Sequence, residues 1–221
     1  MDPALSQRLS RVTGDIADAA RAAHRDPASI TTVVVTKFHP ASLVRDLHTL
    51  GVRDFGESRH QEAQPKVEEL RDLEATWHFV GQVQSKKAQQ IAVYSHIIHS
   101  VDRESLVDAL GTNDRGVFIQ VNLTDDHERG GVHPDALPAL VDRVAGTSLR
   151  LLGLMAVAPL DGEPRRAFAR LRELSALATA IIPGAGALSM GMSGDFRDAI
   201  LEGATHLRIG TAITGNRLWE G

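Results

Sequence analysis

The sequence predicts an α/β protein built as a single (β/α)8 barrel of the TIM type. Three observations lead to this prediction. Short apolar runs rich in β-branched residues alternate with stretches whose apolar residues recur at the helical period, and about eight such runs can be counted. The 221 residues suffice for one closed barrel. No linker rich in Pro, Gly or Ser divides the chain, so we expect residues 1–221 to form one domain.

A doubly wound open sheet is the alternative fold for the same alternation of strands and helices. Sheets of this kind that bind dinucleotides carry G-x-G-x-x-G directly after the first strand. No such motif follows the first apolar run, and the glycine-rich stretch GAGALSMG (184–191) precedes a strand instead of following one. The barrel is therefore the favoured fold.

The first predicted elements are a helix, a strand and a second helix. The opening helix is indicated by an apolar stripe at helical spacing that ends near Asp26-Pro27: Leu5, Leu9, Val12, Ile16, Ala19 and Ala23. The run ITTVVVTK (30–37) is stiff and β-branched, which favours a strand. A new helical stripe follows at Leu43, Val44, Leu47 and Leu50.

The same unit then recurs along the chain. The segment VRDFGE (52–57) reads as a strand, and Ser58 with Gln61 forms an S-x-x-Q capping box that predicts the start of the next helix. Further strands are predicted at 77–81, 97–101, 117–121, 153–157, 188–192 and 206–210. Helical stripes separate most of them, for example Leu137, Leu140, Val141 and Val144, and Phe168, Leu171, Leu174, Leu177 and Ile181. The charged stretch 125–131 is predicted to be a long mobile loop.

Composition excludes several classes of partner and site. Lys+Arg 24 against Asp+Glu 28 gives a net charge of -4, which favours neither a nucleic acid nor an anionic membrane surface. The absence of cysteine excludes disulfides, zinc-thiolate sites, iron-sulfur sites and a cysteine nucleophile. No apolar window reaches the length of a membrane span and the N-terminus lacks the apolar core of a signal peptide, so we expect a cytoplasmic protein.

The histidines do not predict a metal site. His96 and His99 are three residues apart at the entry of a predicted strand, which puts them on opposite faces. His78 lies inside a strand between Trp77 and Phe79, which we expect to pack between the barrel and its helices. No H-E-x-x-H motif is present.

In a barrel of this kind the chemistry lies at the carboxyl ends of the strands. The predicted strand ends carry Lys37, Glu57, Gly81, Ser100 with Asp102, Asn122, Pro159, Ser193, and Gly210 with Thr211. Lys37 ends a wholly apolar strand, where an ammonium group is costly unless it loses its proton or forms an imine. An amine there is a candidate nucleophile for a carbonyl compound. The alternative is a lysine whose side chain extends to solvent.

The last two strands supply residues suited to an anion. Ser193 is expected to open a helix after the seventh strand, where free backbone N–H groups and its hydroxyl can hold a phosphate; the alternative is a plain helix cap. Arg208, Gly210 and Thr211 close the eighth strand beside the same point. Phosphate sites after strands seven and eight are frequent in these barrels.

Seven blocks in order resemble the pyridoxal phosphate homeostasis protein family: VVVTKFHP, FGESRHQEA, WHFVGQVQSKK, IHSVD, LLGLMAVAP, LSMGMSGDF and THLRIGTAITG. The resemblance implies a barrel of the alanine racemase type, a fold-type III domain for pyridoxal 5′-phosphate (PLP) without the C-terminal β domain. It implies that Lys37 forms the Schiff base and that Ser193, Gly210 and Thr211 contact the phosphate. It also implies that Arg208 faces the pyridine nitrogen, as in the related racemases.

The chain departs from the family pattern at two positions. Ser58 stands where the family usually has the asparagine of G-E-N, and Lys86 where it has the asparagine of Q-S-N-K. The basic residue that the family carries in its long loop matches Arg129.

The resemblance implies a protein that binds, buffers or delivers PLP, with related B6 vitamers as ligands and PLP-dependent apoenzymes as recipients. A slow amino-acid racemase is the alternative. Racemases of this fold use a tyrosine from an added domain as second base, but the one tyrosine here, Tyr94, is expected at the opposite end of the barrel, and few residues follow Gly210. A cation at the ring nitrogen such as Arg208 also weakens the electron sink of PLP. A third hypothesis, a class I aldolase, shares Lys37 and the phosphate site but binds no chromophore.

Overall fold

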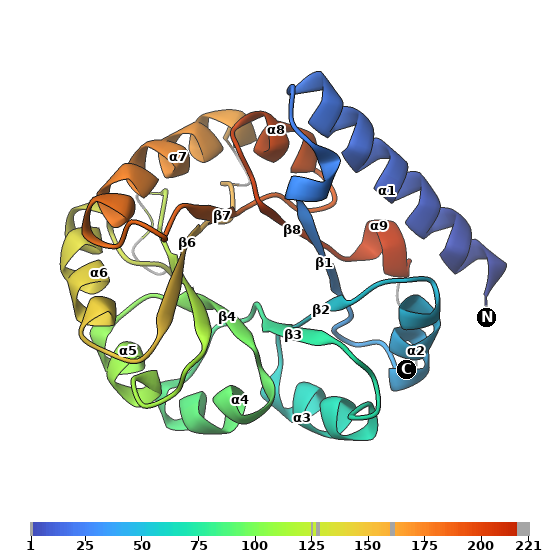
Figure 1. Cartoon of the computed structure of the whole chain (residues 1–221), viewed down its shortest axis with the longest axis horizontal. Coiled ribbons are helices and arrows are strands. Elements are labelled where there is room, and N and C mark those ends of the chain that lie inside the picture. The colour runs from blue at the N-terminus through green and yellow to red at the C-terminus, as the bar shows by residue number, and fades with distance from the viewer. Residues whose placement is uncertain (1, 125, 127–128, 160–161, 216–221) are drawn as a thin grey trace.

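The structure is a computed structural model that describes residues 2–124, 126, 129–159 and 162–215. Eight parallel strands close into a barrel in chain order, and Figure 1 shows the helices as a ring around it. The strands are β1 (Thr31–Val35), β2 (Asp54–Glu57), β3 (Thr76–Phe79), β4 (Ile97–Val101), β5 (Gly116–Gln120), β6 (Arg150–Met155), β7 (Ala187–Ser189) and β8 (His206–Ile209). The predicted barrel and its eight strands are confirmed.

The first helix precedes β1, the others come after strands, and together they cover the outside of the barrel (Figure 1). They are α1 (Pro3–Ala22), α2 (Ala41–Thr49), α3 (His60–Glu69), α4 (Ala88–Tyr94), α5 (Glu104–Leu110), α6 (Leu137–Ala145), α7 (Pro164–Ile181), α8 (Phe196–Leu201) and α9 (Thr211–Thr214). None of the helices within the described ranges is long and apolar enough to span a bilayer.

Two local predictions fail or fall outside the described residues. The capping box at Ser58 and Gln61 is wrong, because α3 begins at His60 and its cap residue, Arg59, makes no side-chain capping bond. In the stretch 125–131, which was predicted to be a long mobile loop, positions 125, 127 and 128 lie outside the described residues.

The strands present different chemistry to the two sides of the barrel wall. Val34, Phe55 and Trp77 belong to the apolar core that the strands share with the surrounding helices. Val33 and Val35 point to the barrel interior, where both lie against Gly56. The interior also holds Ser189, Arg208 and Phe118. His99 and His206 pack against Phe118, and His78 packs against these two histidines. The outer core is therefore apolar, whereas the interior mixes apolar and polar side chains.

The barrel closes between its first and last strands. Thr31 pairs with His206 and Val34 with Ile209 in a parallel register. Helix α1 crosses this seam on the outside beside α8 and α9 (Figure 1), and Arg8 Nε donates a hydrogen bond of 2.8 Å to the carbonyl of Ile213. The closure places the carboxyl ends of β7, β8 and β1 next to one another.

Candidate functional site

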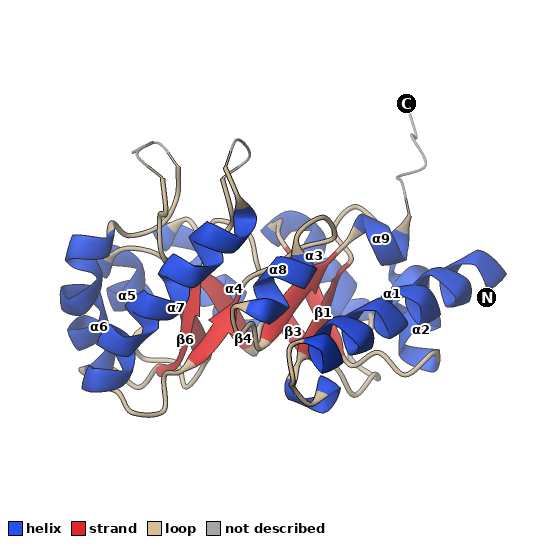
Figure 2. Cartoon of the chain, turned by 90° about the horizontal axis from the view of Figure 1, so that it is seen from above, coloured by secondary structure: helices blue, strands red, loops and turns tan. Residues whose placement is uncertain are grey.

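Four of the five residues predicted for the site follow the carboxyl ends of three adjacent strands. Lys37 follows β1, Ser193 follows β7, and Gly210 and Thr211 follow β8. Gly210 lies against Val35, the last residue of β1. Helix α9, which begins at Thr211, lies at the upper end of the barrel in Figure 2. The closed sheet therefore brings these loops to one end of the barrel.

Lys37 lies one residue beyond a buried threonine, and its own side chain is exposed. The burial cost expected from its apolar strand is therefore absent, and the extended, solvent-reaching alternative describes the side chain correctly. The direction of the Lys37 side chain still follows the strand. Val33 is in register with the inward-facing Arg208, and Val35 also points inward. Because every second residue of a strand faces the same side, Lys37 comes to the mouth of the barrel.

Helix α3 holds the loop that contains Lys37. Phe38 has a φ of 66°, a left-handed conformation that is strained for a bulky residue. Its backbone N–H donates to Glu62 Oε2 at 3.1 Å, and the Arg59 guanidinium lies 5.0 Å from the centre of its ring. On the other side of Lys37, the carbonyl of Thr36 accepts a hydrogen bond of 3.0 Å from Lys66 Nζ. The backbone around Lys37 is thus fixed from both sides.

A buried ion pair lies behind this loop, between the barrel wall and α3. Lys66 Nζ is 2.6 Å from Glu57 Oε1, and both side chains are buried. The Thr36 hydroxyl donates to the same carboxylate oxygen at 2.7 Å, while Glu57 Oε2 has no hydrogen-bond partner. Burial raises the pKa of Glu57, and Lys66 and Thr36 oppose that rise. Glu57 could be predicted only as a strand end and Lys66 not at all, because nothing in the local pattern shows that Lys66 faces the barrel and meets the end of β2.

The turn after β7 carries Ser193. Gly191 lies two residues beyond β7 with a φ of 94°, and a Cβ there would lie 2.6 Å from Ala199 Cβ, so only glycine fits. Ser193 is not the helix cap considered from the sequence, because α8 begins at Phe196 and its cap residue is Asp195. The Ser193 hydroxyl instead accepts a hydrogen bond of 3.4 Å from the backbone N–H of Ala212. This contact joins the loops that follow β7 and β8.

Arg208 is buried inside the barrel with neutral partners. Its Nη1 donates to Ser189 Oγ at 2.7 Å and its Nη2 to the carbonyl of Ala156 at 2.9 Å. Within the described ranges no carboxylate forms an ion pair with it, so the structure speaks against the alternative of a barrel arginine paired with a carboxylate. Burial lowers its pKa to about 10, with Asp195 opposing the shift. A buried guanidinium that touches no carboxylate among the described residues is suited to hold a polar group of a ligand.

The remaining side chains named from the sequence lie elsewhere. Tyr94 ends α4, and its hydroxyl lies 3.3 Å from His60 Nδ1 in the layer of helices outside the barrel wall. Burial and the nearby Glu57 raise the pKa of this phenol. Arg129 Nη2 donates to the carbonyl of Ala158 at 2.9 Å and so joins the loops after β5 and β6. The described residues contain no group of three or more histidine, aspartate or glutamate side chains placed to hold a metal ion.

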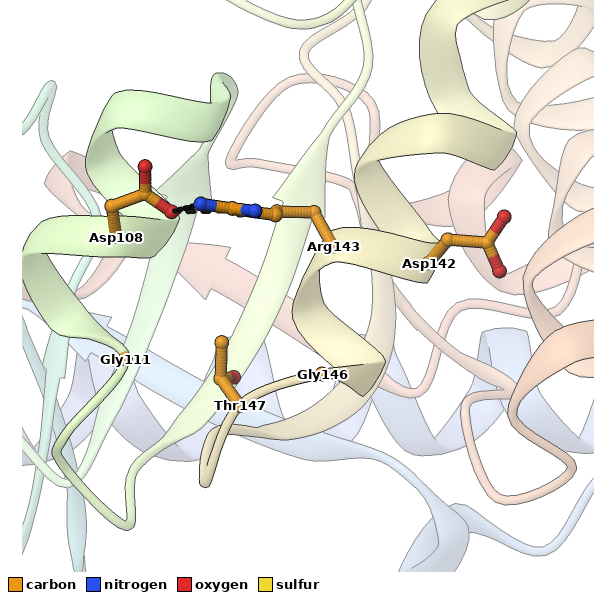
Figure 3. A pocket seen from close by; sticks show the side chains of 6 residues that line it. All are labelled: Asp108, Gly111, Asp142, Arg143, Gly146 and Thr147. Carbon is orange, nitrogen blue, oxygen red and sulfur yellow. Dashed lines mark hydrogen bonds and ion pairs between the residues drawn. The ribbon is translucent and has the colours of Figure 1, made fainter.

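A hollow between α5 and α6 lies away from these loops. Figure 3 shows it lined by Asp108, Gly111, Asp142, Arg143, Gly146 and Thr147. Gly111 and Gly146 follow the last residues of their helices, so the hollow lies toward the amino ends of the strands. Arg143 Nε reaches across it to Asp108 at 2.8 Å, whereas Asp142 points away. We therefore place the candidate site at the barrel mouth and not in this hollow.

Residues 9–217 match the family described as "Alanine racemase, N-terminal domain". The pyridoxal phosphate homeostasis protein of Pseudomonas aeruginosa is 43% identical over 96% of this chain and 96% of that protein. The chain belongs to the pyridoxal phosphate homeostasis protein family. The member from Escherichia coli is 34% identical and covers 96% of this chain and 97% of its own length. The resemblance drawn from the seven sequence blocks is therefore confirmed.

Solved structures agree with this family and with its fold. PipY of Synechococcus elongatus, solved with PLP bound, has a TM-score of 0.81 at 34% identity and covers 95% of this chain and 99% of its own. Alanine racemase from Corynebacterium glutamicum has a TM-score of 0.71 at 15% identity. That likeness covers 93% of this chain and 60% of the racemase, so the two proteins share the fold of the barrel.

Proposed function

We propose that this protein binds PLP covalently through Lys37 and buffers or delivers it, a role in keeping with the name of its relatives, the pyridoxal phosphate homeostasis proteins. The observation that carries the proposal is the convergence of Lys37, Ser193, Gly210 and Thr211 at one end of the barrel, above the buried Arg208. This set combines an amine, hydroxyls and a guanidinium. Each of these can engage one part of PLP: the amine its aldehyde, the hydroxyls its phosphate and the guanidinium its ring nitrogen.

The residues at the mouth fit the cofactor. The Ser193 and Thr211 hydroxyls and the backbone at Gly210 would hold the phosphate, since the contact between Ser193 and Ala212 already joins the two loops. Arg208 has only neutral partners among the described residues, and the ring nitrogen would give its guanidinium a further acceptor. Bound PLP supplies an aldehyde carbon that condenses with a primary amine and releases water. Lys37 is the amine at this end of β1, and its exposed side chain allows the cofactor to enter and leave.

The geometry favours a carrier over a racemase. Inverting an amino acid on a barrel of this type needs a proton-transferring group on each face of the cofactor. Tyr94, the one tyrosine of the chain, lies outside the barrel wall, where its hydroxyl is hydrogen-bonded to His60. Arg208 would leave the ring nitrogen unprotonated, which weakens the electron sink. We propose that PLP-dependent apoenzymes are the recipients of the cofactor.

Borohydride reduction followed by peptide mass spectrometry tests the covalent site. PLP added to the purified protein should give a visible absorbance band, and reduction should fix the cofactor on the peptide that contains Lys37. The variant Lys37→Ala should lose the band, whereas Lys87→Ala should keep it. An adduct found only on Lys86 or Lys87 would refute the assignment, and a protein without a chromophore would favour the aldolase hypothesis.

The carrier proposal has its own test. Alanine or serine racemisation by the loaded protein should not exceed that of free PLP. Turnover at ~1 s⁻¹ or above, which is ordinary for an enzyme, would show that the protein is a racemase. Transfer of the cofactor is tested in two arrangements. The loaded protein and a PLP-dependent apoenzyme are either separated by a dialysis membrane or mixed in one solution. Activation that needs no contact would refute direct delivery and leave buffering.

A further inference from the structure

Five side chains form a continuous chain of hydrogen bonds through the inside of the barrel. Asp54 Oδ1 lies 3.0 Å from His78 Nε2, and His78 Nδ1 lies 2.9 Å from His99 Nε2. His99 Nδ1 lies 2.7 Å from Ser189 Oγ, which accepts from Arg208 Nη1 at 2.7 Å. The chain begins at the first residue of β2, at the amino end of the barrel, and crosses β3, β4 and β7 to reach β8.

The two ends of this chain have fixed and opposite hydrogen-bonding roles. A guanidinium can only donate, and an ionised carboxylate can only accept. Between Arg208 and Asp54 lie one hydroxyl and two imidazoles, and each carries one proton when neutral. One arrangement then satisfies every contact with one donor and one acceptor. In it Ser189 donates to His99, His99 donates from Nε2 to His78, and His78 donates from Nε2 to Asp54.

The surroundings of the chain favour this neutral arrangement. His78, His99 and Ser189 are each at most 1% exposed, while the Asp54 side chain is 30% exposed at the open end. Phe118 stacks on the His99 ring with 4.7 Å between the ring centres. Burial lowers the pKa of His99 well below its usual value, and the neighbouring His78 and Arg208 add to this effect. An extra proton on His99 would occupy Nδ1 and leave the Ser189 hydroxyl hydrogen without its acceptor.

We propose that Asp54, His78, His99 and Ser189 are positioning residues for Arg208. The acceptor-only carboxylate sets the tautomers of both histidines, and these turn the Ser189 lone pair toward the guanidinium. Arg208 is thereby held at Nη1 by Ser189 and at Nη2 by Ala156, with its other N–H groups left for a ligand. The consequence for recognition of the ring nitrogen rests on the proposed function of PLP binding. The direction of the hydrogen bonds from Arg208 to Asp54 does not depend on PLP and can be tested on the protein alone.

The first test determines the tautomers by two-dimensional ¹H–¹⁵N NMR of the imidazoles, on protein freed of cofactor. Both His78 and His99 should carry their proton on Nε2 and have an unprotonated Nδ1. In Ser189→Ala the same tautomers should persist, because Asp54 sets them. A His99 protonated on Nδ1 in the parent protein would overturn the proposal.

The second test compares PLP with its 1-deaza analogue, in which carbon replaces the ring nitrogen. Ser189→Ala removes one hydrogen bond to a charged group, so the affinity for PLP should fall about tenfold. The affinity for the deaza analogue should change less than about twofold, because it has no acceptor for Arg208. Equal losses for both ligands would show a merely structural role for Ser189.

Asp54→Asn provides a second variant at a partly exposed position far from the mouth. An amide both donates and accepts, so it no longer sets the direction of the chain. We expect PLP affinity to fall about threefold with no change for the deaza analogue. Asp114→Asn is the matched control, since Asp114 lies before β5 at the same end, is 77% exposed and pairs only with Arg150 among the described contacts. Equal behaviour of the two variants would overturn the proposal, whereas a parent protein that binds no PLP would refute the proposed function instead.

Discussion

The buried pair of Glu57 and Lys66 allows a sharp prediction about stability. Replacing Lys66 with methionine keeps an unbranched apolar side chain that reaches as far as Cε but removes the ammonium group. The loss breaks two hydrogen bonds, of 2.6 Å to Glu57 and 3.0 Å to the carbonyl of Thr36. Glu57 is 1% exposed and one of its oxygens already has no partner. Breaking a buried pair by removing one partner costs about 3–5 kcal/mol. The variant should lose that much free energy of unfolding near neutral pH.

The pH dependence of this loss identifies its cause. Burial raises the pKa of Glu57, and removing Lys66 takes away the largest opposing influence. The folded variant therefore binds a proton at a pH where the unfolded chain does not, and its stability falls as pH rises through that range. Urea unfolding of parent and variant at about pH 8 and about pH 5.5 should show a smaller difference at the lower pH.

Two further variants make the test decisive. Lys87→Met, which removes a surface lysine bonded to Gln90, should stay within about 0.5 kcal/mol of the parent. The double variant Glu57→Gln with Lys66→Met should recover most of the lost free energy, because it buries no charge. A Lys66→Met protein within about 1 kcal/mol of the parent at both pH values would refute the reasoning.

Three other predictions concern the mouth and the interior of the barrel. Ser193→Ala and Thr211→Val should each weaken PLP binding about ten- to a hundredfold but leave binding of unphosphorylated pyridoxal nearly unchanged; equal effects on both ligands would place the phosphate elsewhere. Arg208→Glu should favour protonation of the ring nitrogen and shift the absorbance maximum of the loaded protein, and an unchanged spectrum in a folded, loaded variant would contradict the contact. Burial lowers the pKa of His206 from 6.5 to about 4, so the unfolded chain binds more protons and the free energy of unfolding should fall across that range as pH falls. Urea titrations of His206→Asn should show a shallower fall, and an identical slope would exclude His206 as the cause.

The fold could be predicted from the sequence because its signals are local. Each strand is a short apolar run in the sequence, and most of these runs are separated by an apolar stripe at helical spacing. All four apolar residues of the stripe in α6 are buried as expected: Leu137, Leu140, Val141 and Val144. The site residues could be predicted only as a set of strand ends, and their roles toward PLP stay predictions. The structure adds that Lys37 is exposed and that Ser193 does not cap α8.

The polar interior could not be predicted, for a physical reason. His99 and Ser189 are 90 residues apart and meet only because the barrel closes. Alternation along β4 shows that His99 faces one side of the sheet, but not which distant side chain lies opposite. The burial of Lys66 is equally hard to predict from the sequence, because Glu57, the carboxylate that pairs with it, lies on a different element. Contacts of this kind depend on tertiary closure and leave no pattern in a short window of sequence.

The seam between β1 and β8 has a consequence for how the protein is made. Lys37 lies near the beginning of the chain, whereas Arg208 and Thr211 lie near its end, and the pairing of Thr31 with His206 joins the two regions. A ribosome adds about 5–20 residues per second, from the N-terminus onward. The early strands must therefore wait, with their barrel edge open, until the last strand has left the exit tunnel. The proposed PLP site needs both regions, so it can form only after residue 211 has been added, and a chain stalled before residue 206 would expose an unpaired strand edge, which is a known route to aggregation.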